Sequence, residues 1–279
     1  MGPAVSVVVP AYNEAARLAT SLPRLLDLTA TDGIEVLVVD DGSTDDTVAV
    51  AEAHLKGTRT GRVLSLPRNR GKGAAVRAGV LEAAGAAVVY MDADLAADLD
   101  DLGSLLEALS GADIAVGSRA VPGSRVFDST FPRAVMGRSW NAMVRLVTGL
   151  ELHDSQCGFK GFQAPVARTL FQRSRIDGFA FDVEILALAQ REGMKIVEVP
   201  VTWRAVGGSS VRPVLDSMLM ARDLARIRLR RTGIRSETEP TPSGATPIRP
   251  LTPVKDERAG GPGCPLEAIP MRADPSSDR

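Results

Sequence analysis

The feature that most constrains this chain is a series of short apolar runs without polar alternation. They occur at residues 5–9, 36–39, 63–66, 87–91 and 114–116. A strand that reads as a continuous apolar run is covered on both faces, as in a parallel sheet. Helical patterns separate the runs near residues 14–27, 45–55, 73–84 and 99–109. This alternation predicts an α/β fold with a Rossmann-like, mostly parallel sheet flanked by helices, and it places ligands at the carboxyl ends of the strands.

The first two strands are each followed by residues that can either cap a helix or bind a ligand. After the first strand, Pro10 ends the run and Asn13 is a suitable cap for the next helix. After the second strand come two adjacent acids, Asp40 and Asp41, which exceed what capping needs. One carboxylate at this point can accept a hydrogen bond from a nucleobase N–H or a ribose hydroxyl.

The next two strand ends add a cation and a pair of acids. The third strand leads into Gly71-Lys72-Gly73, which offers backbone N–H groups and a cation to a phosphate but matches no Walker P-loop. The fourth leads into Asp92 and Asp94, which can share a Mg²⁺ or Mn²⁺ ion completed by substrate phosphates. Taken alone, these acids also fit a solvated surface turn. Together, the four strand ends describe a site for a nucleoside diphosphate.

From residue 4 to about residue 231, the chain resembles the family-2 glycosyltransferases with a GT-A fold. Among them it is similar to the dolichyl- or polyprenyl-phosphate sugar synthases. The matching segments, in family order, are PAYNEAARL, VVDDGSTDDT, NRGKGAAVRAG, MDADLA, GSR at residues 117–119 and DSQCGFKGF at residues 154–162. The last segment is similar to the glucosyl type, D-x-Q-C-G-F-K, whereas mannosyl enzymes resemble D-x-x-S/T-G-F-R. The resemblance favours UDP-glucose over GDP-mannose as the donor.

The resemblance implies roles for particular residues. The implied nucleotide-sugar contacts are Pro10, Tyr12, Glu14, Asp40, Asp41, Lys72, Asp92 and Ala93. It implies a Mg²⁺ or Mn²⁺ ion at Asp92 and Asp94, and it makes Asp94 and Asp154 the candidate catalytic residues. The candidates for holding an acceptor phosphate are Arg119, Arg133, Arg138 and Arg212. The glucosyl type has Gly-Ser-Lys after the tryptophan, so here Arg212 would take the place of that lysine.

The implied reaction is an inverting, metal-dependent transfer of a sugar onto a polyprenyl or dolichyl phosphate. A phosphate monoester has a second pKa of about 6 and needs no general base, so Asp154 would then orient groups. The alternatives are mannosyl transfer from GDP-mannose and transfer to a soluble hydroxyl compound, for which Asp154 would act as the base.

Two other classes of enzyme also place acids or nucleotides at strand ends. A phosphatase of the haloacid dehalogenase type prefers the acid pair after the first strand, with a threonine shortly after it. A nucleotidyltransferase prefers a glycine-rich loop containing arginine after the first strand, and Pro10-Ala11-Tyr12 is not such a loop. Both remain as alternatives of a different class.

We expect a glycosyltransferase domain over residues 1–234, with the nucleotide-sugar part at about 1–120 and the acceptor-side part at about 121–234. Residues 214–231 read as a basic helix that can either lie on an anionic membrane or pack on the domain. A net charge of −1 gives no sign of a nucleic-acid partner. The two cysteines form no disulfide framework, and no run of about 18 apolar residues occurs. We therefore expect a cytoplasmic protein, with peripheral contact at the cytoplasmic face of a membrane as a further expectation.

The composition changes at residue 235. Residues 235–279 contain half of the chain's 18 prolines and no aromatic residue. Such a segment buries too little apolar surface to offset the entropy lost on ordering, so the sequence predicts a disordered, proline-rich tail.

Truncation after Gly233 should therefore leave the melting temperature and the turnover of a soluble assay nearly unchanged. Differential scanning calorimetry and a transfer assay on the truncated and full chains check this. A fall of many degrees in the melting temperature would mean that the tail contains a structured element.

Overall fold

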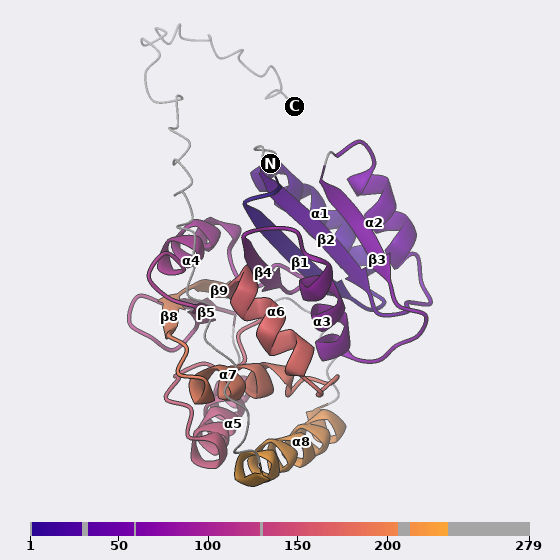
Figure 1. Ribbon diagram of the computed structural model, residues 1–279. Coiled ribbons are helices and arrows are strands. Elements are labelled where there is room, and N and C mark those ends of the chain that lie inside the picture. The colour runs from indigo at the N-terminus through magenta and orange to yellow at the C-terminus, as the bar shows by residue number, and fades with distance from the viewer. Residues whose placement is uncertain (1, 30–32, 59, 129–130, 206–212, 234–279) are drawn as a thin grey trace, which may run out of the picture.

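The computed structural model describes residues 2–29, 33–58, 60–128, 131–205 and 213–233, which are coloured in Figure 1. Within two helices only the backbone is described at residues 131–136, 138, 213–217 and 230–233. Arg212 and the tail from residue 235 lie outside the described residues, as do the side chains of Arg133 and Arg138.

The described residues form one central sheet of seven strands in the order β3-β2-β1-β4-β7-β5-β8. The strands are β1 (Val5–Ala11), β2 (Ile34–Asp40), β3 (Gly61–Ser65), β4 (Ala87–Met91), β5 (Ile114–Ser118), β7 (Phe159–Gln163) and β8 (Ile196–Pro200). Neighbouring strands are parallel except at β7, which is antiparallel to both β4 and β5. Two short strands, β6 (Arg125–Phe127) and β9 (Thr202–Arg204), pair separately.

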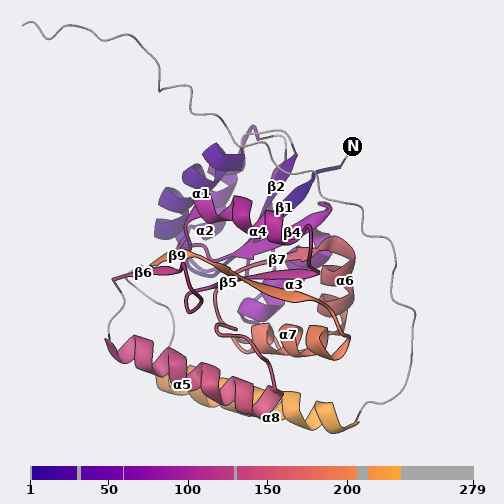
Figure 2. The same cartoon turned by 90° about the vertical axis from the view of Figure 1, so that its left-hand side faces the viewer.

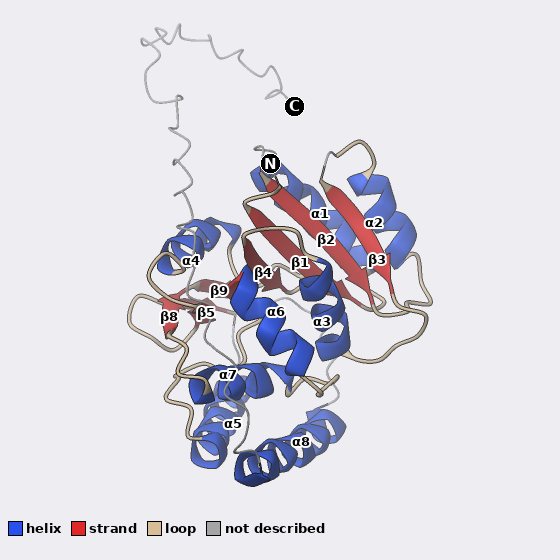
Figure 3. Cartoon of the chain, in the orientation of Figure 1, coloured by secondary structure: helices blue, strands red, loops and turns tan. Residues whose placement is uncertain are grey.

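Helices cover both faces of the central sheet (Figure 3). One face packs against α1 (Ala15–Thr29), α2 (Thr47–Leu55) and α4 (Leu102–Ala108), and the other against α3 (Lys72–Glu82), α6 (Ala164–Arg173) and α7 (Phe181–Arg191). Val7 and Val9 of β1 enter the first core, whereas Val8 enters the second. Because both faces of the sheet are buried, the residues that point to either face are mostly apolar.

Two further helices, α5 (Phe131–Thr148) and α8 (Pro213–Gly233), lie side by side beneath α7 (Figure 2). Val144 of α5 and Leu224 and Ile227 of α8 are buried in the second core. No described helix combines the length and the apolar character that crossing a bilayer requires.

The predicted α/β class and mostly parallel sheet are confirmed. The five predicted strands and four predicted helices are present with ends shifted by a few residues, and the fourth helix begins as a 3₁₀ turn, η1 (Leu99–Asp101). Strand β7 was not predicted, because Lys160 and Gly161 interrupt its apolar run and make it read as a motif in a loop.

A buried ionic cluster underlies the central strands. Lys160 of β7 is 0% exposed, and its ammonium donates to the Cys157 carbonyl at 2.5 Å and to the Asp182 carboxylate at 2.8 Å. The Tyr90 hydroxyl of β4 donates to the same carboxylate. Burial, together with the negative charge of Asp182, raises the pKa of Tyr90 well above its usual value. Each buried charge in this cluster thus has a partner, and removing one partner would leave the other charge buried and unpaired, which is costly.

Replacing Lys160 by methionine should leave Asp182 buried without its cation. We expect Lys160→Met to lower the free energy of unfolding by about 3–5 kcal/mol, measured by urea denaturation. Lys160→Met combined with Asp182→Leu should recover part of that loss.

The matched control is Arg173→Met, which breaks the ion pair with Glu192. Those two side chains are 47% and 42% exposed, so the loss should be about 1 kcal/mol or less. Equal losses for the buried and the exposed pair would contradict the proposed role of burial.

Candidate active site at the carboxyl ends of the strands

The loops after β1 and β2 interlock. The backbone N–H of Asn13 donates to Ser43 Oγ at 2.9 Å, and the N–H of Thr44 donates to Asn13 Oδ1 at 2.9 Å. The N–H of Glu14 donates to Thr47 Oγ1 at 2.8 Å. Capping of the following helix was one of two interpretations of Asn13; its side chain joins the two loops, and its φ of 53° places it in the left-handed region.

The other residues predicted after β1 differ in their access to solvent. Pro10 is buried in the sheet, whereas Tyr12 is 38% exposed at its edge. The Glu14 carboxylate accepts two hydrogen bonds from Arg17, each at 2.6 Å. Of these three, Tyr12 presents its side chain most openly at the edge.

The adjacent acids after β2 organise the surrounding backbone. Asp40 and Asp41 are each 3% exposed. The Asp41 carboxylate accepts the N–H groups of Arg70 at 2.9 Å and Gly71 at 2.7 Å, and Asp40 accepts that of Ser43 at 3.0 Å. Burial raises the pKa of Asp41, and these two N–H groups partly oppose it. Each oxygen of Asp41 accepts one N–H and keeps a second lone pair for a ligand.

The glycines at the start of α3 are required by packing. A Cβ at Gly71, where φ is 113°, would lie 2.5 Å from the Asp177 carbonyl oxygen. A Cβ at Gly73 would lie 2.6 Å from the Ile176 carbonyl oxygen. The close approach of the backbone at residues 176–177 therefore explains both glycines without a bound phosphate. Lys72, which lies between them, pairs with Asp92.

Lys72 and Asp92 form an ion pair, with Nζ 2.6 Å from Oδ1. Burial lowers the pKa of Lys72, but the negative charges of Asp92 and its neighbours outweigh this and raise it overall. The N–H of Asp92 donates to the Gly158 carbonyl at 3.1 Å. A Cβ at Gly158 would overlap the Asp92 carboxylate, so any other residue there would force that carboxylate to move.

The second acid of the pair is held by its own turn. Asp94 Oδ1 accepts the N–H of Ala96 at 3.1 Å, and Ala93 between the two acids is buried. Burial, followed by the negative charge of Asp92, raises the pKa of Asp94. A divalent cation would offset the repulsion between these carboxylates, so the pair fits a hard metal ion.

Within the described residues, no group of three or more His, Cys, Asp or Glu side chains is placed to hold a metal ion. Two protein carboxylates are what a Mg²⁺ site needs when substrate phosphates and water supply the other oxygens. The residues present therefore fit a metal that is bound together with a nucleoside diphosphate.

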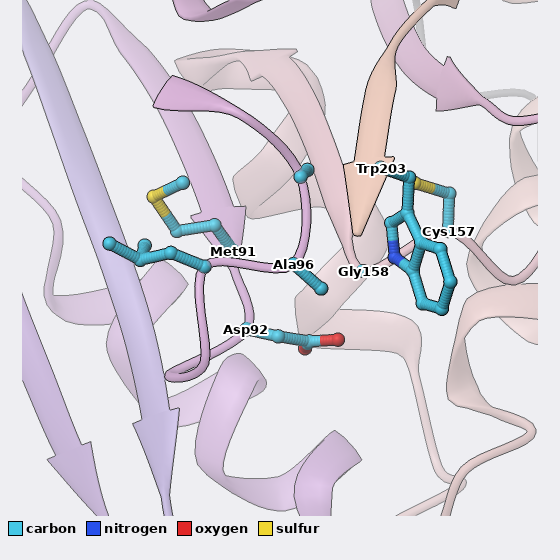
Figure 4. Close-up of a pocket in the computed structure, with 8 residues that line it drawn as sticks. Met91, Asp92, Ala96, Cys157, Gly158 and Trp203 are labelled. Atoms are coloured by element: carbon cyan, nitrogen blue, oxygen red, sulfur yellow. The ribbon is translucent and has the colours of Figure 1, made fainter. Parts of the chain in front are cut away.

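A small pocket opens beside Asp92 (Figure 4). Its lining comprises Met91, Asp92, Leu95, Ala96, Ala97, Cys157, Gly158 and Trp203. Figure 4 shows the Asp92 carboxylate extending below Ala96, with the Trp203 indole beside Cys157. The pocket thus joins the end of β4 to the segment that precedes β7.

The Arg119–Asp154 pair is linked to this pocket through Trp203. Arg119 Nε lies 2.6 Å from Asp154 Oδ2 and Nη2 lies 2.9 Å from Oδ1. The guanidinium also lies 5.4 Å from the centroid of the Trp203 ring. Asp154 is 7% exposed. Burial raises its pKa, but the hydrogen bonds and positive charge of Arg119 lower it by more, so the net shift is downward. This carboxylate is held in its charged form.

The Glu198 carboxylate of β8 fixes the backbone before Asp154. It accepts the N–H of His153 at 2.9 Å and the N–H of Asp154 at 3.0 Å. Glu198 was not predicted as a site residue, although its position between two valines, as a lone acid in an apolar run, is a signal that could have found it. Gly158, Lys160 and Asp182 were also missed, because their importance depends on contacts with distant segments.

The sequence left open whether the basic helix at residues 214–231 packs on the domain or lies on a membrane. Arg222 and Arg226 pair with Asp223 within the helix, and Arg228 donates to the Val147 carbonyl of α5 at 3.2 Å. Among its described basic residues, the helix therefore contacts α5 through Arg228.

Curated relatives match most of this chain. A dolichyl-phosphate beta-glucosyltransferase of Drosophila melanogaster is 38% identical, with 81% of this chain and 74% of the relative covered. Enzymes of the same name from Homo sapiens and Saccharomyces cerevisiae are 34% and 33% identical, with 81% of this chain covered in both cases. The matched regions cover 75% of the Homo sapiens enzyme and 74% of the Saccharomyces cerevisiae enzyme.

Solved structures share the fold. Glucosyl-3-phosphoglycerate synthase from Mycobacterium tuberculosis, in complex with Mn²⁺, UDP-glucose and phosphoglyceric acid, gives a TM-score of 0.60 at 25% identity. The match covers 84% of this chain and 82% of that one. The model of the family described as glycosyl transferase family 2 matches residues 6–171. This chain belongs to glycosyl transferase family 2.

Proposed function

We propose that this enzyme transfers glucose from UDP-glucose to a polyprenyl or dolichyl-type phosphate, with inversion and with a divalent metal ion. The observation that carries the proposal is the grouping of Lys72, Asp92 and Asp94 at the edge of the sheet. The Arg119–Asp154 pair lies across Trp203 from this group. The names of the curated relatives support the donor and the acceptor.

The donor occupies the edge formed by the ends of β1, β2 and β4. Pro10 and Tyr12, with Glu14 and the acids Asp40 and Asp41, surround the nucleoside. Tyr12 is the exposed member of this group, and Asp41 retains lone pairs for a base or a ribose. Lys72 and the turn that contains Asp92, Ala93 and Asp94 lie where the diphosphate is placed.

The main chemical demand of the reaction is the negative charge that grows on the leaving nucleoside diphosphate. Asp92 and Asp94 would hold a metal ion that would supply Lewis-acid stabilisation of that charge. Lys72 is kept protonated by its acidic neighbours, so its ammonium is available to the same phosphates. The Lys72 ammonium is held in place by Asp92 before the substrate arrives, which reduces the reorganisation cost during the reaction.

The acceptor needs no general base if it is a phosphate, because it is already largely ionised at neutral pH. Asp154 suits this reaction, since Arg119 lowers its pKa and makes it a weak base. Asp154 therefore positions Arg119, whose remaining N–H donors face an incoming anion. A soluble hydroxyl acceptor would require Asp154 to take up a proton, and its surroundings oppose that.

Peripheral membrane contact through α5 and α8 accords with a lipid acceptor. Met143 and Leu146 of α5, and Met218 and Leu229 of α8, are exposed although they are large and apolar. The two helices lie side by side (Figure 2), so the same layer of the protein bears all four exposed apolar side chains. We propose that this layer contacts the membrane surface.

An assay of donors against acceptors tests the proposal. UDP-glucose and polyprenyl phosphate with Mn²⁺ should yield UDP and a glucosylated lipid, without inorganic phosphate. EDTA should abolish transfer, and excess Mn²⁺ or Mg²⁺ should restore it. Asp92→Asn and Asp94→Asn should each abolish transfer without unfolding the protein, because each removes a hard anionic ligand.

The matched control is Asp100→Asn, an exposed acid in the nearby η1 turn, which should retain full activity. Full transfer in EDTA would reject the metal, and a preference for GDP-mannose would reject the donor. Glucosylation of a soluble hydroxyl compound with no transfer to the lipid phosphate would reject the acceptor.

The arginines predicted to hold the acceptor phosphate give a second test. Arg133→Ala, Arg138→Ala and Arg212→Ala should each raise the acceptor KM about tenfold or more and change the donor KM far less. A charge-assisted contact to phosphate contributes about 1.5–3 kcal/mol. Steady-state kinetics with each substrate varied in turn measure the two constants.

Arg24→Ala, an exposed arginine of α1, serves as the control and should change neither constant. A donor KM that rises as much as the acceptor KM would place these arginines at the nucleotide and not at the acceptor.

A further inference from the structure

A second cavity lies apart from the pocket beside Asp92. Its volume is about 740 Å³, within the range of about 300–1,000 Å³ that is typical of small-molecule sites. It is enclosed by the loop after β3, by the segment between α6 and α7, and by one face of α8. In both views α8 lies below α3 (Figures 1 and 2).

The cavity has a surplus of positive charge. Four guanidinium groups line it, those of Arg70, Arg175, Arg222 and Arg226. The carboxylates in its lining are those of Asp177 and Asp223. The lining therefore carries two more positive than negative charges.

The arginines of the cavity keep hydrogen-bond donors for a ligand. Arg70 pairs with Asp177 at 3.1 Å, and Arg226 pairs with Asp223 at 3.0 Å. A guanidinium has five N–H donors, so one such pair leaves several of them unused. The exposed Arg175 side chain makes no hydrogen bond or ion pair within the part of the chain that the structure describes. A planar guanidinium group can donate two parallel hydrogen bonds to two oxygens of one phosphate.

Another part of the cavity is apolar. Phe179 comes from the segment between α6 and α7, and Leu219 and Met220 come from α8. Leu219 is 39% exposed, so part of its side chain is open to a ligand. A small inorganic anion would satisfy the arginines and leave this surface uncovered.

We propose that the cavity binds a phosphate group carried on an apolar chain, at a site separate from the pocket beside Asp92. The arginines bind the phosphate, and the apolar side chains bind the first part of the chain. Both features belong to one cavity, which a lipid phosphate fills better than a free phosphate does.

The cavity shares a wall with the proposed donor site. The N–H groups of Arg70 and Gly71 are held by Asp41, and the next residue, Lys72, pairs with Asp92. A lipid phosphate in the cavity would thus lie one loop away from the diphosphate. The choice of polyprenyl phosphate as a ligand rests on the proposed function, whereas the charge and shape of the cavity do not.

Vesicle binding by the full chain tests this site, with no UDP-glucose and no metal present. Neutral phosphatidylcholine vesicles with and without polyprenyl monophosphate are compared by flotation. The variant Arg175→Ala with Arg226→Ala should weaken the phosphate-dependent part of binding about tenfold. Leu219→Gln should weaken it severalfold, because it makes the apolar wall polar.

The controls change the same charge and the same apolar surface outside the cavity. Arg24→Ala with Arg191→Ala removes two exposed arginines outside α5 and α8, and Leu28→Gln alters a leucine of α1 that is 40% exposed. Both should bind as the unaltered protein does. Arg175→Lys with Arg226→Lys should retain much of the binding, which separates loss of charge from misfolding.

Competition by inorganic phosphate separates the two sources of the anion. If the arginine variants lose binding of inorganic phosphate but not of the lipid vesicles, the site takes a soluble anion and the proposal is overturned. Equal losses in the cavity variants and the controls would also overturn it. Because no donor is present, these results stand apart from transfer, whose absence would instead overturn the proposed function.

Discussion

Strand β7 runs between β4 and β5 in the direction opposite to both, and its hydrogen bonds join the two halves of the candidate site. Pairing of Met91 with Phe159 places Gly158 directly against Asp92, so closely that a side chain at position 158 would overlap the carboxylate. The same strand carries Lys160, whose ammonium ties the Cys157 carbonyl to Asp182 of α7. The segment with Asp154 is therefore fixed relative to the acid pair by the sheet itself, and not by a flexible loop.

Paired charges around this strand keep the site in one arrangement. Lys72 pairs with Asp92, and Arg119 pairs with Asp154. Although burial opposes both shifts, the partner charges raise the pKa of Lys72 and lower that of Asp154. Asp94 differs, because burial and its neighbour Asp92 raise its pKa, and an added cation relieves this repulsion. The acid pair thus carries excess negative charge, which a divalent metal ion would offset.

The loops at the carboxyl edge are built as one connected unit. Asn13 links the loops after β1 and β2, and Asp41 links the loop after β2 to the start of α3. The start of α3 in turn packs against the backbone near Asp177, which requires Gly71 and Gly73. These contacts place the proposed donor edge and the arginine-lined cavity on opposite sides of the same short loop.

The sequence by itself determined the fold class, the first five strands and the positions of the strand-end residues, because continuous apolar runs are stable only when both faces of a strand are covered. Family motifs in order indicated a family-2 glycosyltransferase, and the match of residues 6–171 confirms it. Only the tertiary structure decided that residues 159–163 form an antiparallel strand, that Asn13 joins loops, and that Glu198 and Asp182 support the site. These features depend on pairs such as Asp154 with Glu198 and Lys160 with Asp182, which are far apart in the chain, and local periodicity carries no information about such contacts.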